Sequence, residues 1–497
     1  MKTTVAALLH DIGKFYQRSE KTKAIQGKNL YEQYMKKNGY IHGAFTAKFI
    51  DENIKSSLPD YANFLNLSAG HHVAEYSIVK EADIISSGHD LKDADEESFD
   101  SDYLLDTFNE DFRSKRLNII FNEISIEGKI EPYKLKLTNN SNLTIEKFKE
   151  ELSKEQATNE YKELYSAMKK ELDNMNLKGY NSYEELHQLI YPIIKEYTTT
   201  IPGSTYNQNY PTVSLFDHLK LTAALANCLK LNNNNEYVLL DYDISGIQKF
   251  IYRVTEGKEA KPNVAKLLRT RSLYLSLLTD FVAYYIVNKF GLTYENVLYS
   301  SGGRGRILVP YSSTFEETIM KIGKEIETNM YYLHNAEISF FIAYSVVTGE
   351  QLIREPLDLI TEDLSIVCDK KKKFKSVFES DQFNPINESN NICPLCFSNT
   401  SNLDICDFCE ILLEINNKIL VSNNKFIIEY DFNRNFVDEE LSIKIGSLGY
   451  IIFHKAESFK LERTSSFYVS INNHTVGDIK YYAKSNIAGK NFEEIAL

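Results

Sequence analysis

The N-terminal part of the sequence places imidazole and carboxylate side chains at intervals that suit metal binding. His10 and Asp11 are adjacent, and an aspartate in such a pair can bridge two cations. The full set of candidate metal ligands is His10, Asp11, His42, His71, His72 and Asp83. Such groups around one or two divalent ions can activate water and hold a phosphate oxygen during hydrolysis. The pattern therefore indicates a hydrolytic metal centre.

A predicted helix carries each of these side chains. Apolar periodicity predicts helices over residues 5–18 and 78–86, a helix that begins at His42, and a helix that ends at 68–72. A bundle of such helices can surround metal ions from several sides. A histidine on the surface beside an aspartate at a helix start is the alternative explanation of the first pair. The further candidates, each on its own predicted helix, favour the metal centre.

Four cysteines form a second candidate metal site near residue 400. Cys393 and Cys396 make one Cys-x-x-Cys hook, and Cys406 and Cys409 make another after nine intervening residues. Four thiolates from two hooks suit one tetrahedral zinc ion with no open coordination position. Disulfides and redox chemistry are the alternatives. The expected reducing compartment opposes the first, and the absence of a thioredoxin-like context opposes the second.

Two carboxylates follow a predicted strand in the middle of the chain. Residues 237–240 are apolar and lead into Asp241 and Asp243, and a Ser-Gly turn then precedes a helical period. A long predicted helix over 265–290 and a predicted hairpin over 297–310 follow. This order of elements predicts a split-βαβ, ferredoxin-like sheet of the kind found in polymerase palms and nucleotide cyclases.

The tip of the predicted hairpin bears on how this sheet uses its carboxylates. Two-metal transfer needs closely placed acids, but the tip carries Arg304 and Gly305. Asp241 and Asp243 could cap the following helix, hold magnesium for nucleotidyl transfer, or line a pocket that binds a nucleotide without chemistry. The arginine argues against catalysis by this sheet alone, so nucleotide binding without chemistry is the favoured interpretation.

The candidate nucleotide site combines backbone and side-chain groups. Backbone N–H groups at a helix start suit a phosphate, and glycines let a ligand approach the backbone closely. Arg304 could contact a phosphate or be a solvated turn residue. The candidate nucleotide-binding residues are Asp243, Ser245, Gly246, Ile247, Ser301, Gly302, Gly303 and Arg304.

Two further features have a plain structural interpretation. Lys261, Lys266, Arg269 and Arg271 form a local basic cluster, which we expect to be a solvated helix face, with contact to RNA or a ligand phosphate as the alternative. His218 lies in a predicted helix with no flanking ligand candidates. We interpret His218 as a packing or capping residue and not as a metal ligand.

Composition limits the classes of protein. The 497 residues suggest three or four domains, and 43% hydrophobic residues are ample for real cores. A net charge of −13 means that any nucleic-acid binding comes from local patches or partner subunits. No window of 18 apolar residues occurs, so we expect no membrane span. Six cysteines without a signal peptide favour the cytosol, and Cys228 and Cys368 are expected to be buried hydrophobes.

The remaining segments give local expectations. Residues 88–112 are strongly acidic and indicate a solvated linker, whereas the polar run 370–373 indicates an exposed helix face. Helices are predicted over 144–175, 183–197 and 214–231, and strands over 117–126, 133–137, 419–421, 426–430, 450–453 and 467–471.

Several of these motifs together resemble one family. The segments that carry the resemblance are 243–251, 269–272, 300–303, the Ser-Leu-Phe-Asp-His run 214–218, the N-terminal His-Asp pair and the four cysteines. They are similar to the large subunit of type III-A, Csm-type CRISPR effector complexes, in the same order. That family continues into a second palm with a Gly-Gly-Asp-Asp loop, which this sequence lacks. The resemblance implies an N-terminal portion or a split form.

The resemblance also implies an activity, cofactors and partners. The His-Asp (HD) domain of the family cuts single-stranded DNA with a transition metal such as Mn, Ni or Co, so the six candidate ligands would bind it, with His10, Asp11 and Lys14 catalytic. Two palms of the family bind ATP with Mg at their junction and make cyclic oligoadenylate when target RNA is bound. Expected partners are the other complex subunits, CRISPR RNA, target RNA and a chain that carries the second palm.

The expected architecture is a multidomain α+β protein. We expect a helical HD nuclease domain (1–88), an acidic linker with a mixed insert (89–210), a degenerate ferredoxin-like palm (211–360), a helix with the four-cysteine zinc element (361–415) and a C-terminal β-rich or α+β module (416–497). Two other functions remain open. One is an architectural subunit with vestigial sites, and the other is a free-standing HD phosphohydrolase that acts on a nucleotide.

Overall fold

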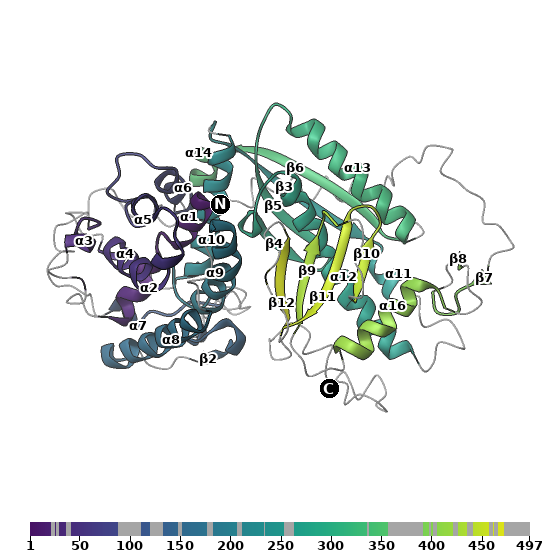
Figure 1. Cartoon of the computed structure of the whole chain (residues 1–497), viewed down its shortest axis with the longest axis horizontal. Coiled ribbons are helices and arrows are strands. Elements are labelled where there is room, and N and C mark those ends of the chain that lie inside the picture. The colour runs from purple at the N-terminus through teal and green to yellow at the C-terminus, as the bar shows by residue number, and fades with distance from the viewer. Residues whose placement is uncertain are drawn as a thin grey trace, which may run out of the picture. The chain divides into compact units, whose positions relative to one another are not determined.

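The chain forms two compact units in the computed structural model (Figure 1). One unit comprises residues 1–237 with 347–357, and the other comprises 238–346 with 358–497. The structure describes residues 1–20, 25, 29–35, 41–87, 111–119, 133–147, 152–175, 182–205, 211–232, 234–252, 263–334, 337–355, 391–396, 399–400, 405–420, 426–434, 441–456, 461 and 466–471. Most of the acidic linker, Lys261, Cys368, the basic run 370–373 and the chain end lie outside these residues.

The described part of the first unit is a helical bundle with one small hairpin. Its helices are α1 (Lys2–Leu9), α2 (Ile12–Ser19), α3 (Asn29–Glu32), α4 (His42–Asn53), α5 (Tyr61–Ser68), α6 (Ile78–Ser87), α7 (Asp111–Ser114), α8 (Lys154–Asn174), α9 (Tyr183–Thr198), α10 (Leu215–Leu231) and α14 (Gly349–Arg354), with 3-10 turns at Lys55–Ser57 and Asn140–Asn142. The hairpin pairs β1 (Tyr133–Leu135) with β2 (Ile145–Lys147). Helix α10 packs against α1 and α6, and α2 packs against α4 and α8.

The helix predicted over residues 5–18 is interrupted, so that prediction is wrong in detail. Helix α1 ends at Leu9 and α2 begins at Ile12. The cause is Thr46 of α4, whose hydroxyl donates to His10 O at 2.8 Å and accepts from Gly13 N at 3.0 Å. Because one side chain binds both backbone groups, the α-helical pattern is broken and the His10–Asp11 pair is displayed on a turn. A Cβ on Gly13 would lie 2.0 Å from His42 O, so glycine permits this close approach of α4.

The other helices of the first unit follow the sequence more closely. Helices α4, α6, α9 and α10 confirm their predictions. The helix predicted over 144–175 begins ten residues late, at Lys154, because Ser153 forms a capping box with Gln156. Helix α5 ends at Ser68, so His71 and His72 lie on the turn beyond it. Among the helices that the structure describes, none combines the length and apolar content that a membrane crossing requires.

The second unit contains the predicted ferredoxin-like sheet. Its strands are β3 (Glu236–Ser245), β4 (Val297–Ser301), β5 (Arg304–Pro310) and β6 (Ser339–Thr348), in the spatial order β4-β5-β3-β6. The helices α11 (Ile247–Tyr252), α12 (Val264–Lys289) and α13 (Phe315–Leu333) and the 3-10 turn Tyr294–Asn296 connect them. This order is that of a split βαβ fold and confirms the predicted topology. The β4–β5 hairpin turns at the two glycines of 302–303.

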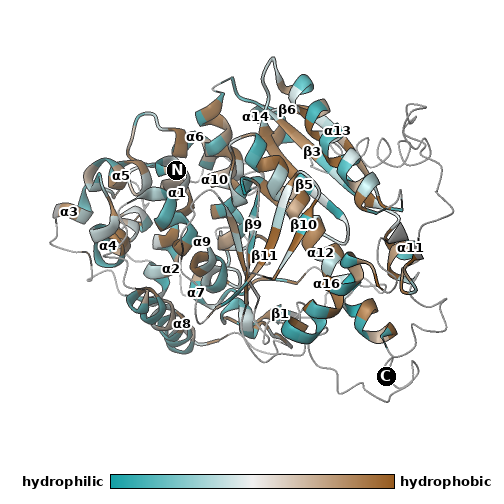
Figure 2. Cartoon of the chain, turned by 45° about the vertical axis from the view of Figure 1, so that its right-hand side comes forward, coloured by the Kyte–Doolittle hydropathy of each residue, from teal (hydrophilic) through white to brown (hydrophobic). Residues whose placement is uncertain are grey.

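A second antiparallel sheet belongs to the same unit. Its strands β9 (Phe426–Asp431), β10 (Ser442–Ile445), β11 (Gly449–Lys455) and β12 (Phe467–Ile471) have the order β10-β11-β9-β12. Figure 2 shows many apolar residues on these strands, and aromatic rings join the sheet to α12, with Tyr284 stacked on Phe467 at 5.0 Å. The prediction of a strand over 419–421 is wrong for its described part, because a π-helical turn, Asn416–Leu420, ends α16 (Asp407–Ile415). Strand β10 was not predicted.

Candidate metal centre and nucleotide site

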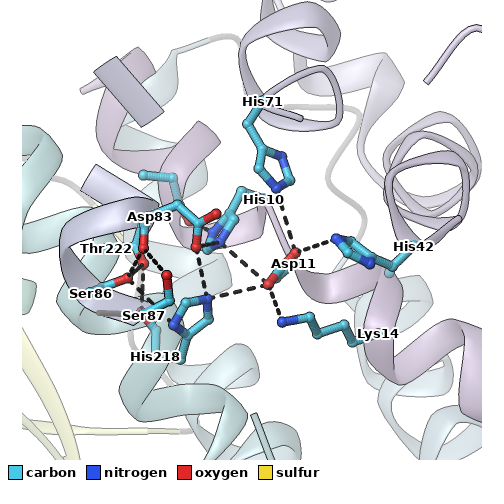
Figure 3. Close-up of polar contacts among 12 residues, drawn as sticks. His10, Asp11, Lys14, His42, His71, Asp83, Ser86, Ser87, His218 and Thr222 are labelled. Atoms are coloured by element: carbon cyan, nitrogen blue, oxygen red, sulfur yellow. Dashed lines mark hydrogen bonds and ion pairs between the residues drawn. The ribbon is translucent and has the colours of Figure 1, made fainter. Parts of the chain in front are cut away.

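The carboxylate of Asp11 lies at the centre of the histidine cluster (Figure 3). Its Oδ1 atom is 3.1 Å from His42 Nε2 and 3.7 Å from His71 Nε2. Its Oδ2 atom is 3.2 Å from His218 Nε2 and 3.5 Å from His10 Nε2. Two groups of possible ligands therefore share Asp11, and within each group the ligand atoms lie within 4.8 Å of one another. The groups are Asp11, His42, His71 and His72, and His10, Asp11, Asp83 and His218.

Hydrogen bonds orient the imidazoles toward this centre. His10 Nδ1 donates to Ala7 O and His71 Nδ1 donates to Ser68 O, each at 2.7 Å. Both bonds use Nδ1 and leave the Nε2 atom of each ring facing the Asp11 carboxylate, where it can bind a metal ion. The buried Nε2 atoms of His10, His71 and His218, and Asp11 Oδ1, have no hydrogen-bond partner in the described structure. Buried polar atoms without partners are costly, so a cation between them fits the residues present.

The electrostatics keep both carboxylates ionised. Burial raises the pKa of Asp11, but Lys14, His10 and His42 outweigh it and hold that pKa well below its usual range. Burial raises the pKa of Asp83, but the imidazoles of His10 and His218, each 3.3 Å from Asp83 Oδ1, outweigh burial and hold that pKa well below its usual range. Two buried, ionised carboxylates surrounded by imidazoles are a ligand set that divalent transition metals favour.

The histidines of the cluster differ in protonation. Burial lowers the pKa of His71 to about 4 and lowers that of His72 still further, so both rings are neutral at pH 7. Burial lowers the pKa of His218, but the nearby carboxylates of Asp11 and Asp83, at 3.2 and 3.3 Å from its Nε2, outweigh burial and raise that pKa to about 9. A divalent ion bound by Asp11 and Asp83 would take the place of the proton on His218.

Lys14 supplies a cation at the edge of the cluster. Its Nζ atom is 2.6 Å from Asp11 Oδ2, and a quarter of its side chain is exposed. Burial lowers its pKa, but Asp11 outweighs that effect and raises it, so the amine is charged. A charged amine beside a metal centre can hold a phosphate oxygen of a substrate.

The four cysteines also come together. Their Sγ atoms lie within 4.8 Å of one another, and the distance between Cys396 Sγ and Cys406 Sγ is 3.5 Å. Cys393 and Cys396 follow β7 (Asn391–Ile392), which pairs with β8 (Asn399–Thr400). None of the four thiols forms a disulfide in the described structure, and Cys406 and Cys409 lie at the start of α16. Hydrogen bonding with Cys396 raises the pKa of Cys406 to about 12, a shift that a bound cation would reverse because metal binding deprotonates thiols. The geometry fits one tetrahedral ion.

The two acids of the ferredoxin-like sheet are paired with arginines of β5. Arg306 donates to both oxygens of Asp241, at 2.7 and 2.8 Å, and Arg304 Nε lies 2.5 Å from Asp243 Oδ2. Both carboxylates are buried. Both acids lie within β3, which runs to Ser245, whereas α11 begins at Ile247, so the interpretation of these acids as caps of that helix is wrong. Arg306 occupies both oxygens of Asp241, which leaves that carboxylate no free oxygen pair for magnesium. Arg304 is exposed, as the solvated alternative expects, but it also closes an ion pair with Asp243, so its guanidinium is not available to a phosphate alone.

The predicted nucleotide-binding residues lie together around the β3 end and the β4–β5 turn. Ile244 N donates to Gly303 O at 2.7 Å, which joins the two segments. A Cβ on Gly246 (φ +92°) would lie 1.9 Å from Glu337 O, and one on Gly303 (φ +85°) would lie 2.3 Å from the Ile247 side chain. These glycines therefore serve packing within the chain. Gly302 differs, because no atom lies within 4 Å of a Cβ built on it, so a ligand can approach its backbone.

Comparison with known proteins identifies the family. The model of the HD domain matches residues 1–100, and the model described as Csm1 subunit domain B matches residues 236–389. A relative in Methanocaldococcus jannaschii, described as the CRISPR system single-strand-specific deoxyribonuclease Cas10/Csm1 (subtype III-A), is 30% identical over 399 residues. The alignment covers 69% of this chain and 45% of the relative. The chain belongs to the Cas10/Csm1 family.

Other Cas10/Csm1 proteins agree with this assignment. The relative of the same description in Enterococcus italicus is 24% identical over 455 residues, which cover 83% of this chain and 56% of the relative. The chain spans about half the length of the curated relatives it matches. The family resemblance stated from the sequence is thereby confirmed.

Solved Cas10/Csm1 structures have the same fold. The crystal structure of a Csm1-Csm4 subcomplex matches with a TM-score of 0.59 and 17% identity, and covers 91% of this chain and 55% of that chain. Csm1-Csm4 cassettes in complex with cA4 and with AMPPNP each match with a TM-score of 0.57 at 17% identity, and cover 93% of this chain and 55% and 56% of those chains. The expected multidomain α+β fold is confirmed.

From the sequence, His218 was not placed among the residues around Asp11. His218 was interpreted as a packing or capping residue, but its Nε2 lies 3.2 Å from Asp11 and 3.3 Å from Asp83. It was missed because α10 lies far along the chain from the other ligands and reaches them only by packing against α1 and α6. The signal was present, since a histidine on an otherwise apolar helix face needs a buried partner.

Two other expectations need correction. Helix α10 belongs to the first unit, so the predicted boundary at residue 211 does not coincide with the division at 237–238. The predicted basic cluster is not a solvated helix face, because Arg271 is 1% exposed and Arg269 donates to Asn416 of the π-helical turn. Lys266 is half-buried, and Lys261 lies outside the described residues.

Proposed function

We propose that this chain is part of a type III-A CRISPR effector and that its first unit cleaves single-stranded DNA. The observation that carries the proposal is the buried cluster around Asp11, in which two sets of metal ligands share one carboxylate. The description of the relatives as single-strand-specific deoxyribonucleases supports the substrate class. Two cations that share a carboxylate suit hydrolysis of a phosphodiester.

Each residue of the cluster would have a defined role in the proposed cleavage. His42, His71 and His72 would hold one ion, His10, Asp83 and His218 the other, and Asp11 both. Bound divalent ions, of which Mn, Ni or Co is proposed, would supply Lewis acidity and an ionised water. Lys14, charged and partly exposed beside Asp11, would bind a non-bridging oxygen of the DNA phosphate. The turn between α1 and α2 holds His10 and Asp11 in place.

Cleavage of labelled single-stranded DNA with manganese tests this proposal. We expect the wild-type chain to cleave, and the double variant His10→Ala, Asp11→Ala to lose cleavage by at least about a thousandfold, on the order of the loss expected when an essential metal ligand is removed. Lys55→Ala, which removes an exposed salt bridge within α4 and its following turn, is the matched control. Cleavage by the double variant at the wild-type rate would overturn the assignment.

We further propose that the second unit supplies one half of an ATP pocket. Gly302 leaves the hairpin backbone open to a ligand, and the match to structures described with AMPPNP and cA4 supports the ligand class. Because Asp241 and Asp243 are paired with arginines, the ligands for magnesium would have to be acids of a second palm. Cyclic oligoadenylate synthesis would therefore need a partner chain or segment with a Gly-Gly-Asp-Asp loop.

The proposed setting is a cytosolic RNA-guided complex. A Csm4-type subunit is a proposed partner, since the matched structures are Csm1-Csm4 assemblies. CRISPR RNA and target RNA would reach this chain through the complex. The four cysteines would hold a structural zinc ion with no open position for chemistry.

One observation favours the architectural alternative for the second unit alone. Its acids are neutralised by arginines, which is what a palm that has lost catalysis would show. The free-standing phosphohydrolase alternative concerns the same metal centre as the nuclease. Offering a panel of nucleotides and single-stranded DNA to one preparation with manganese separates these two activities.

A further inference from the structure

A cluster of aromatic side chains joins the four-cysteine element to the turn at Ser245–Ile247, which we call the nucleotide turn after its proposed role. We call Phe250, Tyr274, His334 and Phe408 the aromatic bridge. The ring of Phe408 lies 5.1 Å from Tyr274, 6.0 Å from His334 and 6.3 Å from Phe250, measured between ring centroids. The other three members are buried, with 4% exposure or less. Four elements, α11, α12, the end of α13 and α16, therefore meet at one point within the second unit.

The four cysteines fix the position of Phe408. This residue lies between Cys406 and Cys409, in the first turn of α16. Cys406 is the N-cap of that helix but its side chain makes no capping hydrogen bond. A thiol is a weak hydrogen-bond acceptor, so Cys406 stabilises this helix start less than a Ser, Thr, Asp or Asn N-cap would. A metal ion that binds both thiolates would hold this first turn, and with it the ring of Phe408, in place.

The opposite side of the bridge supports α11, which leads out of the nucleotide turn. Arg271 is buried, donates to Phe250 O at 2.5 Å and lies 4.9 Å from the Phe250 ring. At the other end of α11, Gly246 fits against Glu337 O, and Glu337 N donates to His334 O at 3.0 Å. One end of α11 therefore packs on the aromatic bridge, and the other end packs on Glu337, whose amide is bonded to His334 of the bridge.

Helix α11 needs this support. It comprises six residues, Ile247–Tyr252, and isolated helices of that length are unstable in water. Phe250 is its one fully buried side chain among the described positions. The order of α11 therefore depends on what packs against Phe250.

We propose that Phe408 is a positioning residue through which metal binding at the four cysteines orders α11 and the adjoining turn at Ser245–Ile247. The consequence for nucleotide binding rests on the proposed ATP site in this unit. When the metal is absent, the first turn of α16 loosens, Phe408 leaves the bridge and α11 frays. Zinc occupancy then sets the affinity of the nucleotide turn without touching the nucleotide.

Hydrogen–deuterium exchange of the full chain tests the coupling directly. The readout is the exchange rate of the amides of residues 247–252, compared among wild type, the chelated wild type, Phe408→Ala and Ile392→Ala. Ile392 is the matched control, since it neighbours Cys393 but is 60% exposed and outside the bridge. We expect exchange to accelerate by about tenfold or more in the chelated protein and in Phe408→Ala, and to be unchanged in Ile392→Ala.

Metal analysis and ligand binding make the outcomes distinct. Phe408→Ala should retain its zinc, which separates a broken link from a lost site, and Phe408→Leu should restore part of the protection. Unchanged exchange in Phe408→Ala, whether or not chelation has an effect, would overturn the proposal. A fluorescent ATP analogue, offered to the chain together with a Gly-Gly-Asp-Asp palm, should bind more weakly to Phe408→Ala. If wild type fails to bind it while the exchange difference persists, the ATP site is wrong and the coupling stands.

Discussion

Replacing Gly246 by alanine should damage the nucleotide turn far more than the same change at Gly302. Both glycines have positive φ, +92° and +62°. A side chain at positive φ costs about 1–2 kcal/mol. The two sites differ in space, because a Cβ on Gly246 would lie 1.9 Å from Glu337 O, whereas nothing lies within 4 Å at Gly302. Relieving that contact moves the backbone before β6 and adds the cost of overpacking, about 1–3 kcal/mol.

We therefore expect Gly246→Ala to lower the local stability by about 2–5 kcal/mol and Gly302→Ala by about 1–2 kcal/mol. Native-state hydrogen exchange at the amides of residues 338–345 measures the free energy of opening at β6 in both variants. Each variant differs from the wild type at one position of the same unit. Because the exchange rates report local opening, comparing the two variants needs no assumption about global unfolding. An equal or smaller loss in Gly246→Ala would refute the packing assigned to this turn.

Four further predictions concern the two candidate metal sites, His334 and the acids of β3. His218→Gln should reduce DNA cleavage by about 100-fold or more while leaving the fold intact, measured by single-turnover kinetics and circular dichroism; wild-type rates would remove His218 from the site. Elemental analysis should find about one zinc per chain, lost together with thermal stability in Cys393→Ser, Cys396→Ser; a stable, zinc-free wild type would count against the site. Burial and Arg271 lower the pKa of His334 to about 3, so below pH 6.5 the unfolded chain binds the extra proton, and His334 alone lowers stability by about 2 kcal/mol at pH 5 relative to pH 7; the loss of stability measured by urea unfolding between these pH values should be smaller by that amount in His334→Gln than in wild type, and an equal loss would contradict the burial of His334. The isolated chain should make no cyclic oligoadenylate from ATP and magnesium, and robust synthesis would show that the paired acids of β3 have been misjudged.

The sequence predicted well where local pattern decides the structure. The order of strands and helices around residues 237–310 gave the ferredoxin-like topology, since apolar period and glycine turns are local properties. All six candidate metal ligands lie in one cluster for the same reason, as each was placed on or beside a helix with one apolar face. The four-cysteine site was readable from spacing alone.

The sequence predicted poorly where distant side chains decide the structure. The break between α1 and α2 is caused by Thr46 on another helix, which no local propensity reveals. Asp241 and Asp243 were interpreted without their partners, because the register of β5 beside β3 determines that Arg306 and Arg304 reach them. His218 joins the metal cluster by tertiary packing of α10.

The central claim is that Asp11 is shared by two metal ions in the first unit. Electron paramagnetic resonance tests it most directly, with manganese titrated into the chain after one equivalent of zinc has filled the four-cysteine site. The account predicts two manganese ions per chain with a spin-coupled spectrum. It also predicts loss of the coupling in Asp11→Asn and one uncoupled ion in His218→Gln. A single uncoupled ion in the wild type, or coupling that survives Asp11→Asn, would contradict the shared carboxylate.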